Sequence, residues 1–128
     1  MFRTIARRFL NASQIETYHR DGVVILPNLI DPDTISQMRN RALKLVDDWQ
    51  PAINQTIFRT NEQSRVADEY FFNSAKNISF FLEEDAQDEN GNLLYPKHES
   101  INKIGHALHD RDPIFKDYSY STKFKQIL

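Results

Sequence analysis

Residue types that can do chemistry gather between positions 99 and 115, where two histidines, one lysine and three acids surround a glycine. If this stretch is extended, its side chains alternate between two faces. Lys103 then shares a face with Gly105 and with small or apolar neighbours, while His106 lies on the opposite face. An ammonium in such a place attracts an anion, because an unpaired buried charge is costly, and the glycine leaves room for a ligand. The competing interpretation is a lysine whose stem covers apolar surface while its ammonium reaches water.

His106 and His109 stand three positions apart, a spacing that would bring both rings to one face of a helix. With Asp110 and Asp112 nearby, the group has side chains of the kind that bind metals. The glycine and the apolar alternation favour a strand instead, in which the two rings point to opposite faces. We therefore predict no metal ligand here and assign neither histidine a catalytic role.

His19 and Asp21 match the H-x-D pattern that supplies two ligands of a two-histidine, one-carboxylate iron site. That pattern requires both side chains to converge from an extended strand. Here the pair falls at the predicted end of a helix, just before Gly22, where side chains two positions apart diverge. We exclude the pair as iron ligands.

A basic extension at residues 1–12, which carries three arginines and no acid, precedes the predicted helices and strands. Ser13 is the predicted N-cap of a first helix, with Glu16 placed for a capping box and Gly22 as its stop. Residues 23–26, Val-Val-Ile-Leu, are typical of a short buried strand.

A second helix begins at Asp31, with Pro32 in its first turn. Apolar residues recur along it at helical spacing and predict a face toward the core. They are Ile35, Met38, Ala42, Leu45, Val46 and Trp49. Pro51 ends this helix, and residues 52–68 are a predicted long connection.

From position 69 the pattern becomes β-like, with aromatic runs at residues 70–72 and 78–82. Asn90-Gly91 predicts a hairpin turn that pairs residues 80–82 with residues 93–95. The acids around this turn suit a solvated tip, because they lack the spacing and the central glycine of an EF-hand calcium loop.

Asp112 and Pro113 start a last predicted helix, which continues to Leu128. It ends without a cap, a glycine or a polar tail, so we expect that the sequence is truncated at this point.

Composition is that of an ordinary globular chain of 128 residues, at most one domain, with 40% apolar and 27% charged residues. The net charge of -2 argues against nucleic acid or an acidic membrane surface as a partner. The absence of cysteine excludes disulfides and thiolate chemistry, and no apolar run approaches the roughly 20 residues that span a bilayer. We expect a cytoplasmic protein, or a mitochondrial one if the arginine-rich start is a transit peptide.

Three stretches together resemble the N-terminal part of the phytanoyl-CoA dioxygenase family. The first is YHRDGVVILPNLID at 18–31, which many oxygenases and also unrelated proteins share. The second is ISFFLEE at 78–84, continuing through DENGNLL at 88–94. The third is SINKIGHALH at 100–109 with DPIF at 112–115, and the last two stretches in this order and spacing are specific.

The resemblance implies an Fe(II)- and 2-oxoglutarate-dependent dioxygenase. The fold class is then α+β, a helical N-terminal region plus the first strands of a double-stranded β-helix of the jelly-roll or cupin-like kind. Lys103 matches a family lysine that contacts 2-oxoglutarate, which makes it the predicted cofactor-binding residue. His106 and His109 match motif positions without a role, and we expect His106 to form hydrogen bonds in the core. The substrate is expected to be a small molecule, of the acyl-CoA class if the family name applies.

The family's H-x-D and distal histidine, which bind iron, and its later arginine for 2-oxoglutarate fall beyond position 128. Residues 13–128 therefore correspond to the front of such a domain, and the resemblance supplies neither a catalytic nor a metal residue. We expect the chain alone to bind no iron catalytically and to be inactive. The leading interpretation is therefore an N-terminal fragment of such a dioxygenase. The alternatives are a non-catalytic truncated isoform that binds a partner or ligand, and an unrelated helical binding module. The sequence predicts neither the substrate in detail nor the oligomeric state.

Overall fold

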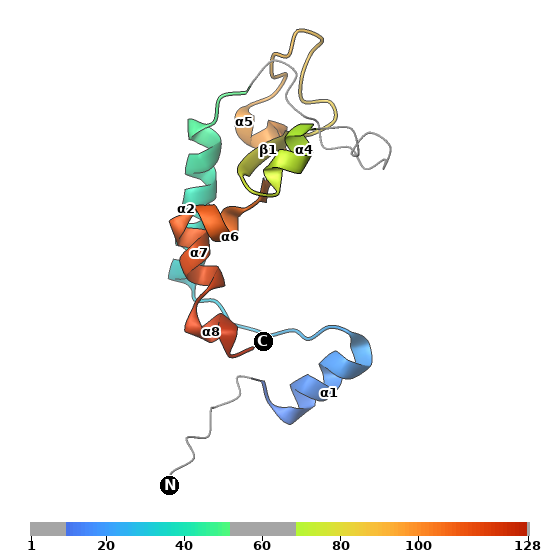
Figure 1. Cartoon of the computed structure of the whole chain (residues 1–128), viewed down its shortest axis with the longest axis vertical. Coiled ribbons are helices and arrows are strands. Elements are labelled where there is room, and N and C mark those ends of the chain that lie inside the picture. The colour runs from blue at the N-terminus through green and yellow to red at the C-terminus, as the bar shows by residue number, and fades with distance from the viewer. Residues whose placement is uncertain (1–9, 52–68, 128) are drawn as a thin grey trace.

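The computed structural model describes residues 10–51 and 69–127, in which helices accompany a two-stranded antiparallel sheet (Figure 1). This mixture of helix and strand agrees with the predicted class in its coarse form. The sheet lies with α4 and α5 at one end of α2, and α7 runs beside α2. The described elements, in chain order, are α1 (Ala12–Asp21), α2 (Pro32–Asp48), α4 (Glu69–Ser74), β1 (Ile78–Leu82), α5 (Lys97–Ser100), β2 (Ile101–His106), α6 (Leu108–Arg111), α7 (Pro113–Ser119) and α8 (Thr122–Lys125).

Helix α1 begins two residues earlier than predicted. Asn11 is its N-cap and forms a capping box with Gln14, each side chain accepting from the other residue's backbone N–H at 2.9 Å. The prediction of Ser13 with Glu16 is wrong, because an asparagine followed three residues later by glutamine satisfies the same free N–H groups. Gly22 ends the helix as predicted, in the left-handed conformation at φ 72°.

Residues 23–26 have no regular secondary structure, so the prediction of a buried strand there is wrong. Val23 is 60% exposed and Ile25 is 81% exposed. A strand needs a hydrogen-bonded neighbour, and the one sheet of the described residues contains β1 and β2 alone.

Helix α2 starts as its sequence predicts. Asp31 is the N-cap, its carboxylate accepting from both the backbone N–H and the hydroxyl of Thr34 at 2.8 Å, and Pro32 occupies the first turn. The predicted apolar face is buried most completely near the C-terminal end of the helix, where Val46 is in the core, whereas Ile35 is 48% exposed.

The C-terminal end of α2 is tied to the sheet and to α5. Trp49 stacks on Phe80 of β1, with ring centroids 5.2 Å apart. Lys97 of α5 donates from Nζ to the backbone carbonyls of Asp47 at 2.9 Å and Trp49 at 2.6 Å. A cation at this position satisfies the carbonyls left free at a helix end. The residues beyond Pro51, up to position 68, lie outside the described residues, and with them the predicted long connection.

Strand β1 pairs antiparallel with β2, in a register that sets Phe81 opposite Lys103. Phe81 and Leu82 are fully buried, and burial of such side chains contributes about 1.5–3 kcal/mol each. The predicted turn at Asn90-Gly91 is present, with Gly91 at φ 81°. The predicted pairing of 80–82 with 93–95 is wrong, since β2 takes that place.

Residues 70–72 form part of the helix α4 and not the predicted strand. These residues are helical and not a strand because the side chain of Tyr70, projecting from α4, forms hydrogen bonds with the backbone of β1. The Tyr70 hydroxyl accepts from the Phe80 N–H and donates to the Phe80 carbonyl, both at 3.0 Å. One side chain thus satisfies backbone groups that a neighbouring strand would otherwise have to pair.

Strand β2 ends at His106, two residues earlier than the predicted alternation implies, and α6 follows. Asp112 is the N-cap of α7, with Pro113 in the first turn, as predicted. The last helix is not continuous, because α7 ends at Ser119 and α8 restarts behind a new N-cap, Ser121.

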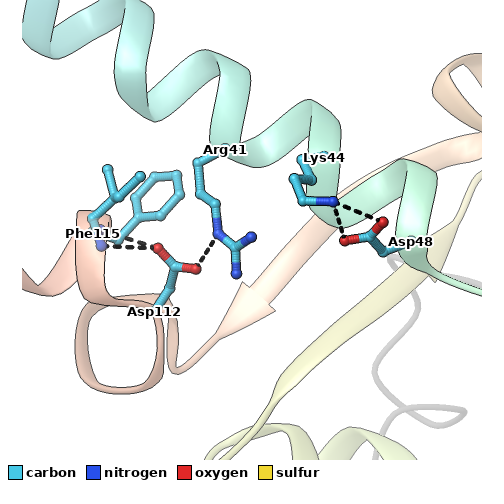
Figure 2. A network of polar contacts seen from close by, with 6 residues as sticks. Arg41, Lys44, Asp48, Asp112 and Phe115 are labelled. Atoms are coloured by element: carbon cyan, nitrogen blue, oxygen red, sulfur yellow. Dashed lines mark hydrogen bonds and ion pairs between the residues drawn. The ribbon is translucent and has the colours of Figure 1, made fainter.

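Helix α7 is fastened to α2 by an ion pair between Arg41 and Asp112 (Figure 2). The Arg41 Nε donates to Asp112 Oδ2 at 2.6 Å, and the Asp112 side chain is fully buried. The other Asp112 oxygen accepts from the backbone N–H groups of Ile114 and Phe115. One carboxylate therefore both starts α7 and holds it against α2.

None of the described helices is long and apolar enough to cross a membrane.

Candidate carboxylate-binding site

Lys103 lies on β2, on the face of the sheet that carries Phe81. Its Nζ is 5.1 Å from the centroid of the Phe81 ring and 5.8 Å from that of Phe71, which comes from α4. Such distances are those of a cation–π contact. The side chain is half-buried. The ammonium therefore lies against an aromatic surface between the sheet and α4.

Gly105 lies two residues further along the same face, opposite Ser79 of β1. The glycine is buried, yet a Cβ built on it would meet no atom of the described residues within 4 Å. Space next to Lys103 on this face agrees with the prediction that the glycine leaves room for an approaching group.

His106 joins Lys103 on these rings, although the strand pattern predicts opposite faces. Its ring centroid is 5.5 Å from that of Phe71 and 5.5 Å from that of Phe81. The prediction fails because His106 is the last residue of β2, where alternation no longer fixes the side chain. Its Nδ1 lies 2.7 Å from Oγ of the fully buried Ser74.

The electrostatics of this pair favour a neutral imidazole beside a charged ammonium. Burial lowers the pKa of His106, and the positive charge of Lys103 lowers it further. At neutral pH the two side chains thus present one cation and one uncharged ring on a common aromatic surface. Such a surface suits a carboxylate, which gains a charge-assisted hydrogen bond in partly desolvated surroundings.

The other histidines and acids of the motif do not converge on this site. His109 and Asp110 are exposed neighbours on α6, with Nε2 3.4 Å from Oδ2, and Asp112 is paired with Arg41. Across residues 10–51 and 69–127, no three His, Asp or Glu side chains are grouped closely enough to hold a metal ion.

His19 and Asp21, the H-x-D pair, lie on α1 and not on the elements that carry the Lys103 site. Asp21 accepts from Arg20 at 2.8 and 2.7 Å, and this guanidinium lowers the pKa of the Asp21 carboxyl. His19 lies on α1 and is exposed.

Two residues of the site were not predicted from the sequence, namely Ser74 and Phe71. Both belong to α4, whereas the aromatic pattern predicts β structure at residues 70–72 and a break after it. Their roles depend on a contact between segments about 30 residues apart, which periodicity within either segment cannot reveal.

A separate pocket of about 310 Å³ lies between α2, α7 and α8. Its walls include Met38, Tyr118 and Lys123, and none of the residues around Lys103 lines it. It therefore belongs to a different part of the molecule.

Comparison with known proteins gives the family. The sequence profile described as phytanoyl-CoA dioxygenase (PhyH) matches residues 18–128. The chain belongs to the PhyH family. This PhyH chain is 40% identical over 118 residues to a phytanoyl-CoA dioxygenase of Arabidopsis thaliana, covering 92% of the chain and 41% of the relative. It is 37% identical to a phytanoyl-CoA dioxygenase domain-containing protein 1 homolog of Dictyostelium discoideum, covering 93% and 42%.

A mouse relative, phytanoyl-CoA dioxygenase domain-containing protein 1, is 35% identical over 124 residues, covering 93% of this PhyH chain and 43% of the relative. The resemblance predicted from the three sequence stretches is thereby confirmed. The chain spans about two fifths of the length of these curated relatives.

Proposed function

We propose that this PhyH chain is part of an Fe(II)- and 2-oxoglutarate-dependent dioxygenase and that Lys103 binds a carboxylate of 2-oxoglutarate. Membership of the family supports the reaction class. The observation that carries the residue assignment is the position of the ammonium, against Phe71 and Phe81 and beside the space at Gly105. Aromatic walls limit water around the ion pair and so strengthen it.

In this proposal Lys103 orients the cosubstrate and does not itself react. The charge-assisted contact fixes one end of the dicarboxylate, and Phe71 and Phe81 keep the ammonium in place. The side chain is anchored on a strand, which holds a binding group more rigidly than a loop does.

The residues described do not fit iron, since they contain no group of three ligating side chains. We propose that the iron ligands belong to the part of a full-length relative that this chain does not span. The 128-residue chain then binds 2-oxoglutarate weakly and releases no succinate from it. Steady succinate release from the purified chain with Fe(II) and 2-oxoglutarate would contradict this part of the proposal.

The substrate of the whole enzyme is proposed to be a small molecule. The names of the Arabidopsis and Dictyostelium relatives refer to phytanoyl-CoA, which makes an acyl-CoA the first class to test. The described residues carry no feature that we assign to the CoA phosphates.

Binding of 2-oxoglutarate to the chain by isothermal titration calorimetry, in buffer stripped of metal, tests the role of Lys103. Lys103→Met keeps an apolar stem on the rings and removes the charge, so we expect at least a tenfold loss of affinity. Lys116→Met, on the exposed side of α7, is the matched control and should bind like the wild type. Equal affinity in Lys103→Met and the wild type would refute the assignment.

A further inference from the structure

The hydrogen bonds around Ser74 determine which nitrogen of His106 carries the proton. The Ser74 Oγ lies 2.5 Å from the backbone carbonyl oxygen of Phe71, a distance that two oxygens tolerate only with a hydrogen between them. A serine hydroxyl has one hydrogen, and Ser74 donates it to the backbone carbonyl oxygen of Phe71. Toward His106, 2.7 Å away, Ser74 therefore offers a lone pair, and the His106 Nδ1 must be the donor.

A neutral imidazole has a single N–H, so protonation at Nδ1 leaves a lone pair on Nε2. The Nδ1 edge of the ring faces Ser74, which is fully buried, while His106 as a whole is exposed. The accessible edge is thus the one that carries Nε2. Burial and Lys103 both lower the pKa of His106, which keeps the ring in this uncharged form at neutral pH.

Lys103 and His106 are placed as a pair, because their side chains contact the same two rings. Phe71 and Phe81 lie 5.8 and 5.1 Å from the Lys103 ammonium, and 5.5 Å each from the His106 ring. Among the described groups packed against His106, Lys103 is the charged one, with Ser74 and Phe71 from α4 and Phe81 from β1. A carboxylate bound to the ammonium would therefore lie near a fixed hydrogen-bond acceptor.

We propose that His106 is a second ligand-binding residue of the Lys103 site, fixed by Ser74 in its Nδ1–H tautomer so that Nε2 accepts a hydrogen bond from a water bound to the carboxylate. This inference rests on the proposed binding of 2-oxoglutarate by Lys103. A water suits the geometry, because 2-oxoglutarate has no donor of its own for Nε2, and a bridging water can donate to both groups.

Nitrogen NMR of the wild-type chain tests the tautomer without any variant. Long-range proton–nitrogen spectra separate a protonated Nδ1 from an unprotonated Nε2, and correlation of the ring signals with the assigned backbone identifies those of His106. We expect the Nδ1–H tautomer, with an Nε2 signal that shifts on saturation with metal-free 2-oxoglutarate. An Nε2–H tautomer, or an Nε2 signal that does not respond to saturating 2-oxoglutarate, would overturn the inference.

Variants then measure the contribution of Nε2 to affinity. Asparagine at 106 can still donate to Ser74 but has no acceptor at the Nε2 position, whereas glutamine reaches that position with its amide oxygen. We expect His106→Asn to weaken 2-oxoglutarate binding about two- to tenfold, His106→Gln to recover most of the loss, and Ser74→Ala to weaken binding similarly. Rescue by glutamine is a result that a purely structural role would not give.

The two assignments fail in different ways. If Lys103→Met loses binding while His106→Asn binds like the wild type, this inference is overturned and the role of Lys103 stands. If Lys103→Met binds like the wild type, both fail. Circular dichroism of each variant, compared with the wild type, identifies those that fold. If His106→Asn does not fold, the tautomer measured in the wild-type chain tests the inference.

Discussion

Removal of Arg41 should destabilise the chain far more than removal of an exposed cation from the same helix. Arg41→Met leaves the fully buried carboxylate of Asp112 without its cation. Breaking a buried pair from one side costs about 3–5 kcal/mol. The Arg41 side chain is 27% exposed, and the carboxylate keeps two backbone donors, in Ile114 and Phe115. Solvent screening and these two bonds reduce the expected loss to about 2–3 kcal/mol.

Lys44 and Asp48, one turn further along α2, provide the matched control (Figure 2). Their charged atoms are 3.0 Å apart, but the side chains are 64% and 59% exposed. Lys44→Met should therefore change the free energy of unfolding by less than about 0.5 kcal/mol. Urea unfolding followed by circular dichroism measures both variants under identical conditions.

A double-mutant cycle separates the pair from the other roles of the two side chains. Asp112→Asn keeps an oxygen that can cap α7 but loses the charge, so the cycle with Arg41→Met isolates the ion pair. We expect a coupling free energy of about 1.5 kcal/mol or more. A coupling below about 0.5 kcal/mol would refute the reasoning, because it would make the pair equivalent to one on the surface.

Three further predictions concern substitutions of single residues. Tyr70→Phe removes the hydroxyl that satisfies both backbone groups of Phe80, so unfolding should become easier by about 1–2 kcal/mol, with faster hydrogen exchange at the Phe80 amide; unchanged exchange would contradict this. Gly22→Ala places a Cβ at φ 72° and should cost about 1 kcal/mol, seen as a lower midpoint of thermal unfolding. The pKa of Asp88 is lowered by hydrogen bonds from Asn92, so its contribution to stability is present above the unfolded pKa near 3.8 and is lost as the pH falls through the folded pKa. Asp88→Asn should remove that acid-induced loss from the amide NMR signals of the loop, and a loop with the same acid dependence in the variant would show that another group is responsible.

The sequence predicted most of the features that depend on near neighbours, although it placed the N-cap of α1 at Ser13 and not at Asn11. Asp31 and Asp112 cap their helices within three residues of themselves, and Gly22 ends its helix through its own backbone conformation. These are local interactions, and the residue type alone favours them. Residues 23–26 and 70–72 were predicted wrongly because the state of an apolar or aromatic run depends on which distant segment lies beside it.

The candidate site divides in the same way. Lys103 and Gly105 could be placed on one face from alternation within a single strand, and the family resemblance identified the lysine. His106 could not, since a strand end leaves its side chain free to follow a hydrogen bond to Ser74. That bond links α4 to β2, and a motif read along the chain contains no signal for it.

The most direct test of the central claim follows the Lys103 side chain itself while 2-oxoglutarate is added. Lysines labelled with ¹³C at Cε give separate NMR signals, and the Lys103 signal is the one missing from Lys103→Met. If Lys103 binds 2-oxoglutarate, this signal shifts saturably as metal-free 2-oxoglutarate is added, while the signal of Lys116 does not shift. A Lys103 signal that does not move, or a larger shift at another lysine, would contradict this assignment.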